Sequence, residues 1–183
     1  MAGKIMGSER SILESLDHAV REPRAAAFLS ALVDDVAAGL GRDSAARLAW
    51  RTVPLDVYAS LPEGIASSWV FVLRAGCSSG AERHPNSIQR VMSYRGWADM
   101  RTWNGKRWVS HHLRCDRDEK LGSRWLSIPA NMWHRPVMDT VDWAVVSFHT
   151  ASDAALIEEL ALDDDRPDRG SRAAELYAGR QAR

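Results

Sequence analysis

The chain has 183 residues, which is long enough for one domain with a substantial core and short for two. It has 24 Lys plus Arg and 24 Asp plus Glu, so no net field favours nucleic acid or an anionic membrane as a partner. Two cysteines are too few for a disulfide scaffold, and neither a secretory leader nor a membrane-spanning apolar run is recognisable. We therefore expect a cytoplasmic protein that binds neither nucleic acid nor membranes.

The first 49 residues are expected to be helical. Apolar residues recur at helical spacing over residues 8–20 and again from Pro23 to about residue 40, and a proline suits the first turn of a helix. Gly39 and Gly41 predict a left-handed stop for this second helix. A further helical turn is expected over residues 43–50. This helical segment should pack on a sheet formed by later residues.

Strand patterns fill residues 50–150. Over residues 67–76, alternation places Trp69, Phe71 and Leu73 on one face of a buried strand. Residues 97–114 carry the strongest hairpin signal, because Asn104-Gly105 suits a type I′ turn. Further strands are expected over residues 123–138 and 141–150. Several short strands with regularly spaced turns predict a mainly β fold, a small barrel or sandwich. Residues 151–183 are predicted to form a helical tail, with a helix over residues 151–162, a charged linker, and a last helix or a frayed end from residue 171.

Polar side chains recur between two glycines in the stretch GCSSGAERHPNSIQRVMSYRG, which spans residues 76–96. Glu82 and His84 are two residues apart, so on a strand both project from the same face. Gln89 would bring an amide oxygen from the next strand. A carboxylate, an imidazole and an amide oxygen are suitable ligands for a divalent metal.

The same spacing resembles the first motif of the cupins, G-(X)5-H-X-H-(X)3,4-E-(X)6-G. Glu82 stands at the position of the first motif histidine, and Gln89 stands at the position of the motif glutamate. The second cupin motif, G-(X)5-P-X-G-(X)2-H-(X)3-N, resembles the set of Gly122, Pro129, Asn131, His134 and Met138. The first interval is one residue too long, Asn131 stands where the motif has glycine, and Met138 stands where it has asparagine. The resemblance covers roughly residues 68–150.

A resemblance to the small single-domain cupins of the RmlC type implies a double-stranded β-helix barrel with helices at both ends of the chain. It implies a metal held by Glu82, His84, Gln89 and His134, with Fe(II) favoured and Mn(II), Ni(II) and Zn(II) also compatible. One carboxylate remains among the four positions, so the charge of the ligand set matches that of the family. The alternative is a barrel that has lost its metal and keeps these residues as a hydrogen-bond network.

Arginine forks suit anionic groups, so Arg90 and Arg101 are candidate clamps for an acidic substrate, and Trp133 is a candidate pocket wall. His111 and His112 are adjacent on a strand, so only one of them can face the interior. Like His149, they are expected to be surface or satisfied core histidines.

The cupin resemblance implies a metal-dependent enzyme, foremost a dioxygenase-type oxidoreductase that acts on a small organic molecule. The alternatives are a metal-dependent isomerase or lyase and a non-catalytic cupin that binds a metal or a small molecule. A homodimer is expected as well, because the edges of a β-rich body must be covered.

Overall fold

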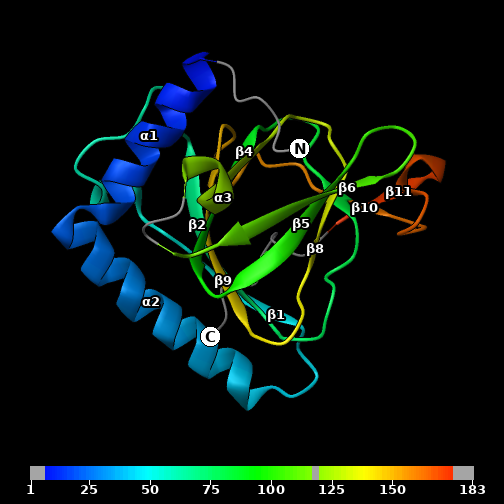
Figure 1. Cartoon of the computed structure of the whole chain (residues 1–183), viewed down its shortest axis with the longest axis horizontal. Helices are drawn as coiled ribbons and strands as arrows, with labels where there is room; N and C mark the ends of the chain where they lie inside the picture. The colour runs from blue at the N-terminus through cyan, green and yellow to red at the C-terminus, as the bar shows by residue number, and fades with distance from the viewer. Residues whose placement is uncertain (1–6, 117–119, 175–183) are drawn as a thin grey trace.

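The structure is a computed structural model that describes residues 7–116 and 120–174. Two antiparallel sheets pack on each other, and two N-terminal helices cover the outer face of one sheet (Figure 1). The helices are α1 (Gly7–Arg21) and α2 (Pro23–Arg42), and both match the helices predicted from apolar spacing. The mainly β prediction is confirmed.

The five-stranded sheet has the order β1 (Leu48–Thr52), β2 (Ser67–Leu73), β9 (Trp143–His149), β4 (Gln89–Arg95) and β7 (Trp125–Ile128). The six-stranded sheet has the order β11 (Ser171–Ala173), β10 (Glu159–Ala161), β3 (Glu82–Arg83), β8 (His134–Val137), β5 (Trp97–Trp103) and β6 (Trp108–Arg114). Neighbours in each order are mostly distant in sequence, which is how the fold gathers residues from both motifs.

The five-stranded sheet separates two cores. Val70, Val146 and Phe148 face the helices and pack in the first core. Leu73 and Val145 face the other sheet and pack in the second core. The alternation predicted for residues 67–76 therefore holds, and each face of β2 has its own apolar partner.

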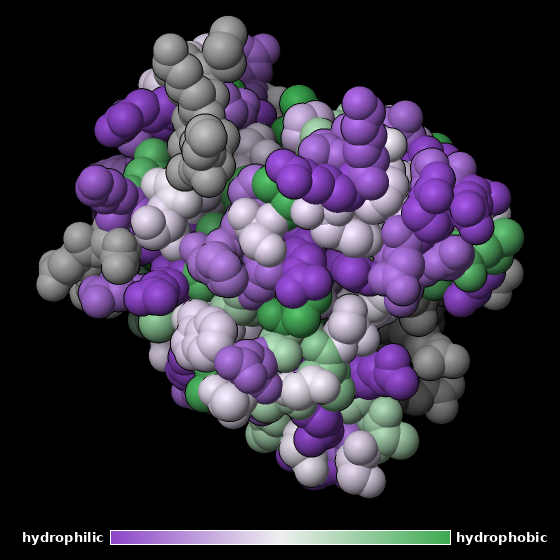
Figure 2. Space-filling model, turned by 45° about the vertical axis from the view of Figure 1, so that its right-hand side comes forward, coloured by the Kyte–Doolittle hydropathy of each residue, from purple (hydrophilic) through white to green (hydrophobic). Residues whose placement is uncertain are grey.

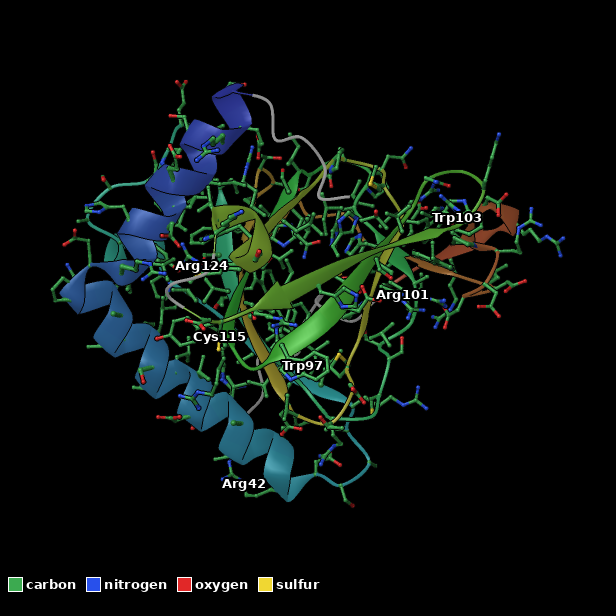
Figure 3. All side chains as sticks on the ribbon, in the orientation of Figure 1. Arg42, Trp97, Arg101, Trp103, Cys115 and Arg124 are labelled. Carbon is green, nitrogen blue, oxygen red and sulfur yellow. The ribbon has the colours of Figure 1, made fainter. Side chains whose placement is uncertain are left out.

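A buried ion pair attaches the helical layer to the sheets. Asp17 of α1 accepts hydrogen bonds from both terminal nitrogens of Arg124 and, at 2.8 Å, from the Trp125 indole nitrogen. Arg124 ends the short helix α3 (Leu121–Arg124) and lies between α3 and α1 in Figure 3. Its side chain is only 7% exposed, and Asp17 supplies a carboxylate for this buried charge.

Four local predictions are wrong. Residues 43–50 form a turn and the start of β1 rather than a helical turn, and α2 continues through Gly39 and Gly41 to an extended cap at Asp43. The hairpin of β5 and β6 has a four-residue loop in which the Asn104 side chain accepts two backbone N–H groups, in place of a type I′ turn. The helix predicted over residues 151–162 is replaced by turns and β10, because this segment pairs with the edge of β3.

The last predicted helix begins instead as β11, and its remainder from residue 175 lies outside the described residues. None of the described helices is both long and apolar enough to cross a membrane.

On the face shown in Figure 2, hydrophilic residues dominate above, and neutral and hydrophobic residues gather below. The cytoplasmic location stays a prediction.

Candidate metal centre

Three of the four expected ligands meet between the two sheets. Glu82 on β3 pairs directly with His134 on β8, and His84 follows Glu82 on the same side of the chain. The ligand atoms of Glu82, His84 and His134 all lie within 4.8 Å of one another. Two ligands of one metal, each about 2.1 Å from it, are at most about 4.2 Å apart, so a small inward movement would let all three share an ion.

Backbone carbonyl groups fix the orientation of both imidazoles. The Nδ1 atom of His134 lies 3.0 Å from the Met132 oxygen, and that of His84 lies 3.3 Å from the Ile157 oxygen. A carbonyl oxygen only accepts, so each Nδ1 donates and each Nε2 is left free for the cluster. Metal-binding histidines are commonly oriented in this way.

One contact in the cluster requires a positive species. His134 Nε2 lies 3.3 Å from Glu82 Oε1, is fully buried, and has no hydrogen-bond partner. A nitrogen lone pair and a carboxylate repel at this distance, so a proton or a cation must lie between them. A divalent metal is one such cation, and a carboxylate with two imidazoles is a donor set that fits it.

Burial controls the ionisation of the groups around the cluster. Burial, reinforced by the neighbouring imidazoles, lowers the pKa of His84 to about 3, and burial lowers the pKa of His149 to about 3 as well. Burial opposes the ionisation of Glu82, but the adjacent His134 holds the pKa of this carboxyl below its usual range. Burial and the charge of Glu82 raise the pKa of Glu158 to about 9.

Gln89 lines the same cavity from the opposite sheet. Its Nε2 donates to Ser147 Oγ at 3.2 Å, while its buried Oε1 has no hydrogen-bond partner and remains available as an acceptor. His149 is paired with Gln89 across β4 and β9, and its ring centre lies 5.0 Å from that of His84. The sequence predicted a surface or satisfied core histidine at position 149, and only its place at the end of a predicted strand could have signalled its position beside the cluster.

Asn131 performs the backbone role of the motif glycine that it replaces. Its φ angle of 66° is in the left-handed region, which asparagine tolerates better than most residues with a side chain. The Asn131 N–H donates to the His84 carbonyl oxygen at 2.8 Å. The loop that leads to His134 is thereby tied to the chain that carries His84.

The two candidate arginine clamps do not face this interior. Arg90 points toward the helices, where Nε and Nη2 donate to Glu9 at 2.7 and 3.0 Å. Arg101 lies on the outer face of β5 and donates to Asp99 at 2.7 Å (Figure 3). The expectation that they hold a substrate at the site is corrected, because both alternate with inward-facing residues on their strands.

Trp133 is likewise not a wall of the site. It packs with Trp103 and Ala81 on the outer side of the six-stranded sheet, with the Arg83 guanidinium 4.5 Å from its ring centre. His111 Nε2 lies 2.9 Å from Thr102 Oγ1 and does not join the metal cluster. Trp133 precedes the inward-facing His134 in the chain, and consecutive residues of an extended segment project to opposite faces.

Apolar and aromatic residues line the interior around the cluster. One cavity of about 10 Å³ is bounded by Trp69, Phe71 and Leu156 together with the polar residues. A second cavity of about 30 Å³ continues between the sheets past Met100 and Trp143. Such volumes hold one or two water molecules, so the interior is closed to larger ligands in this conformation.

The fold and the site thus define a mainly β protein with a buried His/Glu cluster between two sheets. Its similarity to proteins of known structure is low. No protein-family model matches the sequence, and no curated protein matches it. Among solved structures, the capsular polysaccharide assembling protein CapF from Staphylococcus aureus is 13% identical, with a TM-score of 0.45, over 59% of this chain and 29% of that chain.

Two seed proteins are similar to the same degree. Pumpkin seed globulin is 17% identical, and the coconut allergen cocosin is 13% identical. Each match has a TM-score of 0.49 and covers 64% of this chain and 29% of the other. These neighbours are cupin-fold proteins, and this chain spans less than a third of their length. At this distance they transfer no activity, substrate or partner.

Proposed function

We propose that this chain is a cupin-type metal-dependent enzyme, a dioxygenase-type oxidoreductase that acts on a small organic molecule. The observation that carries the proposal is the buried cluster of Glu82, His84 and His134, in which His134 Nε2 and Glu82 Oε1 face each other at 3.3 Å. The two sequence motifs support it, because they name the same three residues.

Glu82, His84 and His134 would hold the metal, and the free oxygen of Gln89 is available beside them. Imidazole and carboxylate ligands suit Fe(II) and Mn(II), and Ni(II) and Zn(II) are compatible. When bound, such an ion supplies a Lewis acid and, if it is iron, a means of activating oxygen. The carbonyl groups of Met132 and Ile157 keep the two histidines oriented. The surrounding side chains exclude bulk water from the cluster.

The lining of the interior indicates a neutral, largely apolar substrate in place of the acidic one expected from the arginines. Phe71, Met100 and Trp143 are among the wall residues, and no lysine or arginine is among the described residues that line the two cavities. A carboxylate would have no cation to meet there other than the metal. An aromatic or aliphatic molecule that binds the metal through one oxygen fits this surface better.

Metal analysis and oxygen uptake test the proposal. The purified protein should contain, or bind when it is added, about one divalent ion per chain. His134→Gln should abolish this metal binding without unfolding the protein. Anaerobic loading with Fe(II), followed by oxygen-electrode assays with neutral aromatic and aliphatic alcohols or phenols, should give substrate-dependent oxygen consumption. A wild-type protein that binds no divalent ion would rule the proposal out.

The small cavities favour a second candidate function, a non-catalytic metal-binding cupin. Volumes of about 10 and 30 Å³ leave no space for a substrate unless the segment around Leu156 moves. The two functions differ in one result, because a non-catalytic protein would bind the ion and yet give no substrate-dependent oxygen uptake or product.

A further inference from the structure

Glu158 is a buried acidic residue that neither sequence motif includes. It is 5% exposed, neither oxygen of its carboxyl group has a hydrogen-bond partner of normal geometry, and the group it interacts with is another carboxyl group, that of Glu82. Burying a carboxyl group without a partner is costly, so proteins normally provide one. Among the residues that the structure describes, Glu158 therefore faces an acid, Glu82, and has no basic partner.

Strand register places Glu158 beside the metal cluster. In the pairing of β10 with β3, Glu159 lies opposite Arg83 and Leu160 lies opposite Glu82. One step further in the same register, Glu158 lies opposite His84. Side chains alternate along a strand, so Glu158 shares its face with Glu82 and His84.

The neighbouring residue confirms which face is which. Glu159 points outward and accepts hydrogen bonds from Arg83 Nε at 2.7 Å and Nη2 at 2.5 Å. Glu158 must then point inward, and its interaction with the Glu82 carboxyl group agrees with that direction. The two adjacent glutamates thus have opposite roles, one in a surface ion pair and one buried.

Hydrogen bonds on both sides hold this segment in place. Asn86 donates to the Ala155 oxygen at 2.6 Å and accepts from the Ile157 N–H at 3.0 Å. On the other side, the Ala174 N–H donates to the Glu158 carbonyl oxygen at 3.0 Å. The position of the carboxyl group is therefore built into the pairing of β3, β10 and β11.

Charge gives the reason for a second acid at this place. With Glu82 as the only carboxylate, a bound dication would leave a net positive charge in an apolar interior, and an unbalanced buried charge is unfavourable. A second carboxylate would neutralise the ion. It would also give the oxygens of Glu158 the partner that they lack.

We propose that Glu158 is a fourth protein ligand, which completes a two-histidine, two-carboxylate centre with Glu82, His84 and His134. The inference rests on the proposed metal site and extends it to a residue from the C-terminal segment. Gln89 is then left to hold a substrate or a water molecule through its free oxygen. A centre with two carboxylates favours Mn(II) or Fe(II) over softer ions.

Mn(II) titration followed by electron paramagnetic resonance tests the assignment, because the signal of the free ion reports binding without any activity. Glu158→Gln removes the charge and keeps the size. Glu159→Gln is the matched control, with the same change one residue away on the outer face. Outer-shell partners of a metal contribute about 10- to 100-fold in affinity, so Glu158→Gln should weaken Mn(II) binding by about 100-fold or more, and Glu159→Gln by less than about threefold.

Equal affinities of wild type and Glu158→Gln, or equal weakening in both variants, would overturn the assignment while leaving the three-residue site intact. A wild type that binds no Mn(II) or Fe(II) would instead overturn the proposed function, and this inference with it. Should Glu158→Gln fail to fold, a crystal structure of the Mn(II)-loaded wild type decides the matter. The anomalous signal should lie about 2.1–2.4 Å from a Glu158 oxygen, and a separation above about 3.5 Å would refute ligation.

Discussion

Moving the carboxylate from position 82 to position 89 tests whether the site needs a carboxylate at all, and whether it needs it at one particular position. Glu82→Gln keeps the shape of the side chain but removes the charge that lies 3.3 Å from His134 Nε2. A large part of the attraction between the cluster and a dication is then lost. The double variant, with Gln89→Glu added, restores a carboxylate at the position where cupins carry one.

The expected size of the effect follows from binding linkage. At a metal concentration 100 times the dissociation constant, the bound ion stabilises the wild type by about 2.7 kcal/mol. If Glu82→Gln binds about 100-fold more weakly, the same concentration contributes only about 0.4 kcal/mol. For a chain of 183 residues, 1 kcal/mol corresponds to about 2–4 °C in melting temperature. The metal-induced shift should therefore fall from about 5–11 °C to about 1–2 °C.

Differential scanning calorimetry with and without Mn(II) measures these shifts. The double variant should recover most of the wild-type shift, since the total ligand charge is restored. Glu14→Gln is the control, because Glu14 pairs only with Arg10 on the surface of α1. Equal metal-induced shifts in wild type, single and double variants would refute the reasoning, because neither residue would then contribute to metal binding.

Three further predictions concern stability and assembly. Asp17→Asn should lower the free energy of unfolding by about 3 kcal/mol, because it removes the carboxylate that pairs with the buried charge of Arg124. The hydrogen bonds from Arg124 and Trp125 outweigh burial and hold the pKa of Asp17 below its usual value, so urea titrations should show this stabilisation in full above about pH 5 and its loss as the pH falls below 4. Gly96→Ala should cost about 2 kcal/mol or more, since φ is +78° and the added Cβ would lie 2.5 Å from the Asp142 oxygen. Sedimentation should give a dimer, with the open edge of β1 as the contact, and a 20.4 kDa species alone at micromolar concentration would contradict this.

Local patterns in the sequence determined the elements that need only some apolar surface to pack against, and no particular partner. The apolar stripes of α1 and α2 predict amphipathic helices, because a helix with one apolar stripe needs only some apolar surface to cover it. The alternation over residues 67–76 predicts β2 for the same reason. Motif spacing also selected Glu82, His84 and His134, because residues i and i+2 share a face of a strand and the family pattern supplies the distant histidine.

Predictions failed where the partner of a segment decides its structure. Residues 151–162 have a helical pattern of apolar residues, yet the segment adds the strand β10 to the edge of β3. The backbone N–H and C=O groups at this edge need hydrogen-bond partners, and pairing with β10 provides them, which a solvated helix would not do. Arg90 and Arg101 look alike in sequence, and only their carboxylate neighbours, Glu9 and Asp99, decide that both serve structure.

The sequence by itself determined a mainly β fold, N-terminal helices and three residues able to hold a metal. Only the tertiary structure decided that His149 and Glu158 stand beside them. Both residues reach the interior through pairing between strands that are distant in sequence, with His149 opposite Gln89 and Glu158 carried by the strand beside β3. Spacing along one strand is a local property that a sequence displays directly, whereas the register between two strands depends on which of them pair and therefore arises only when the chain folds.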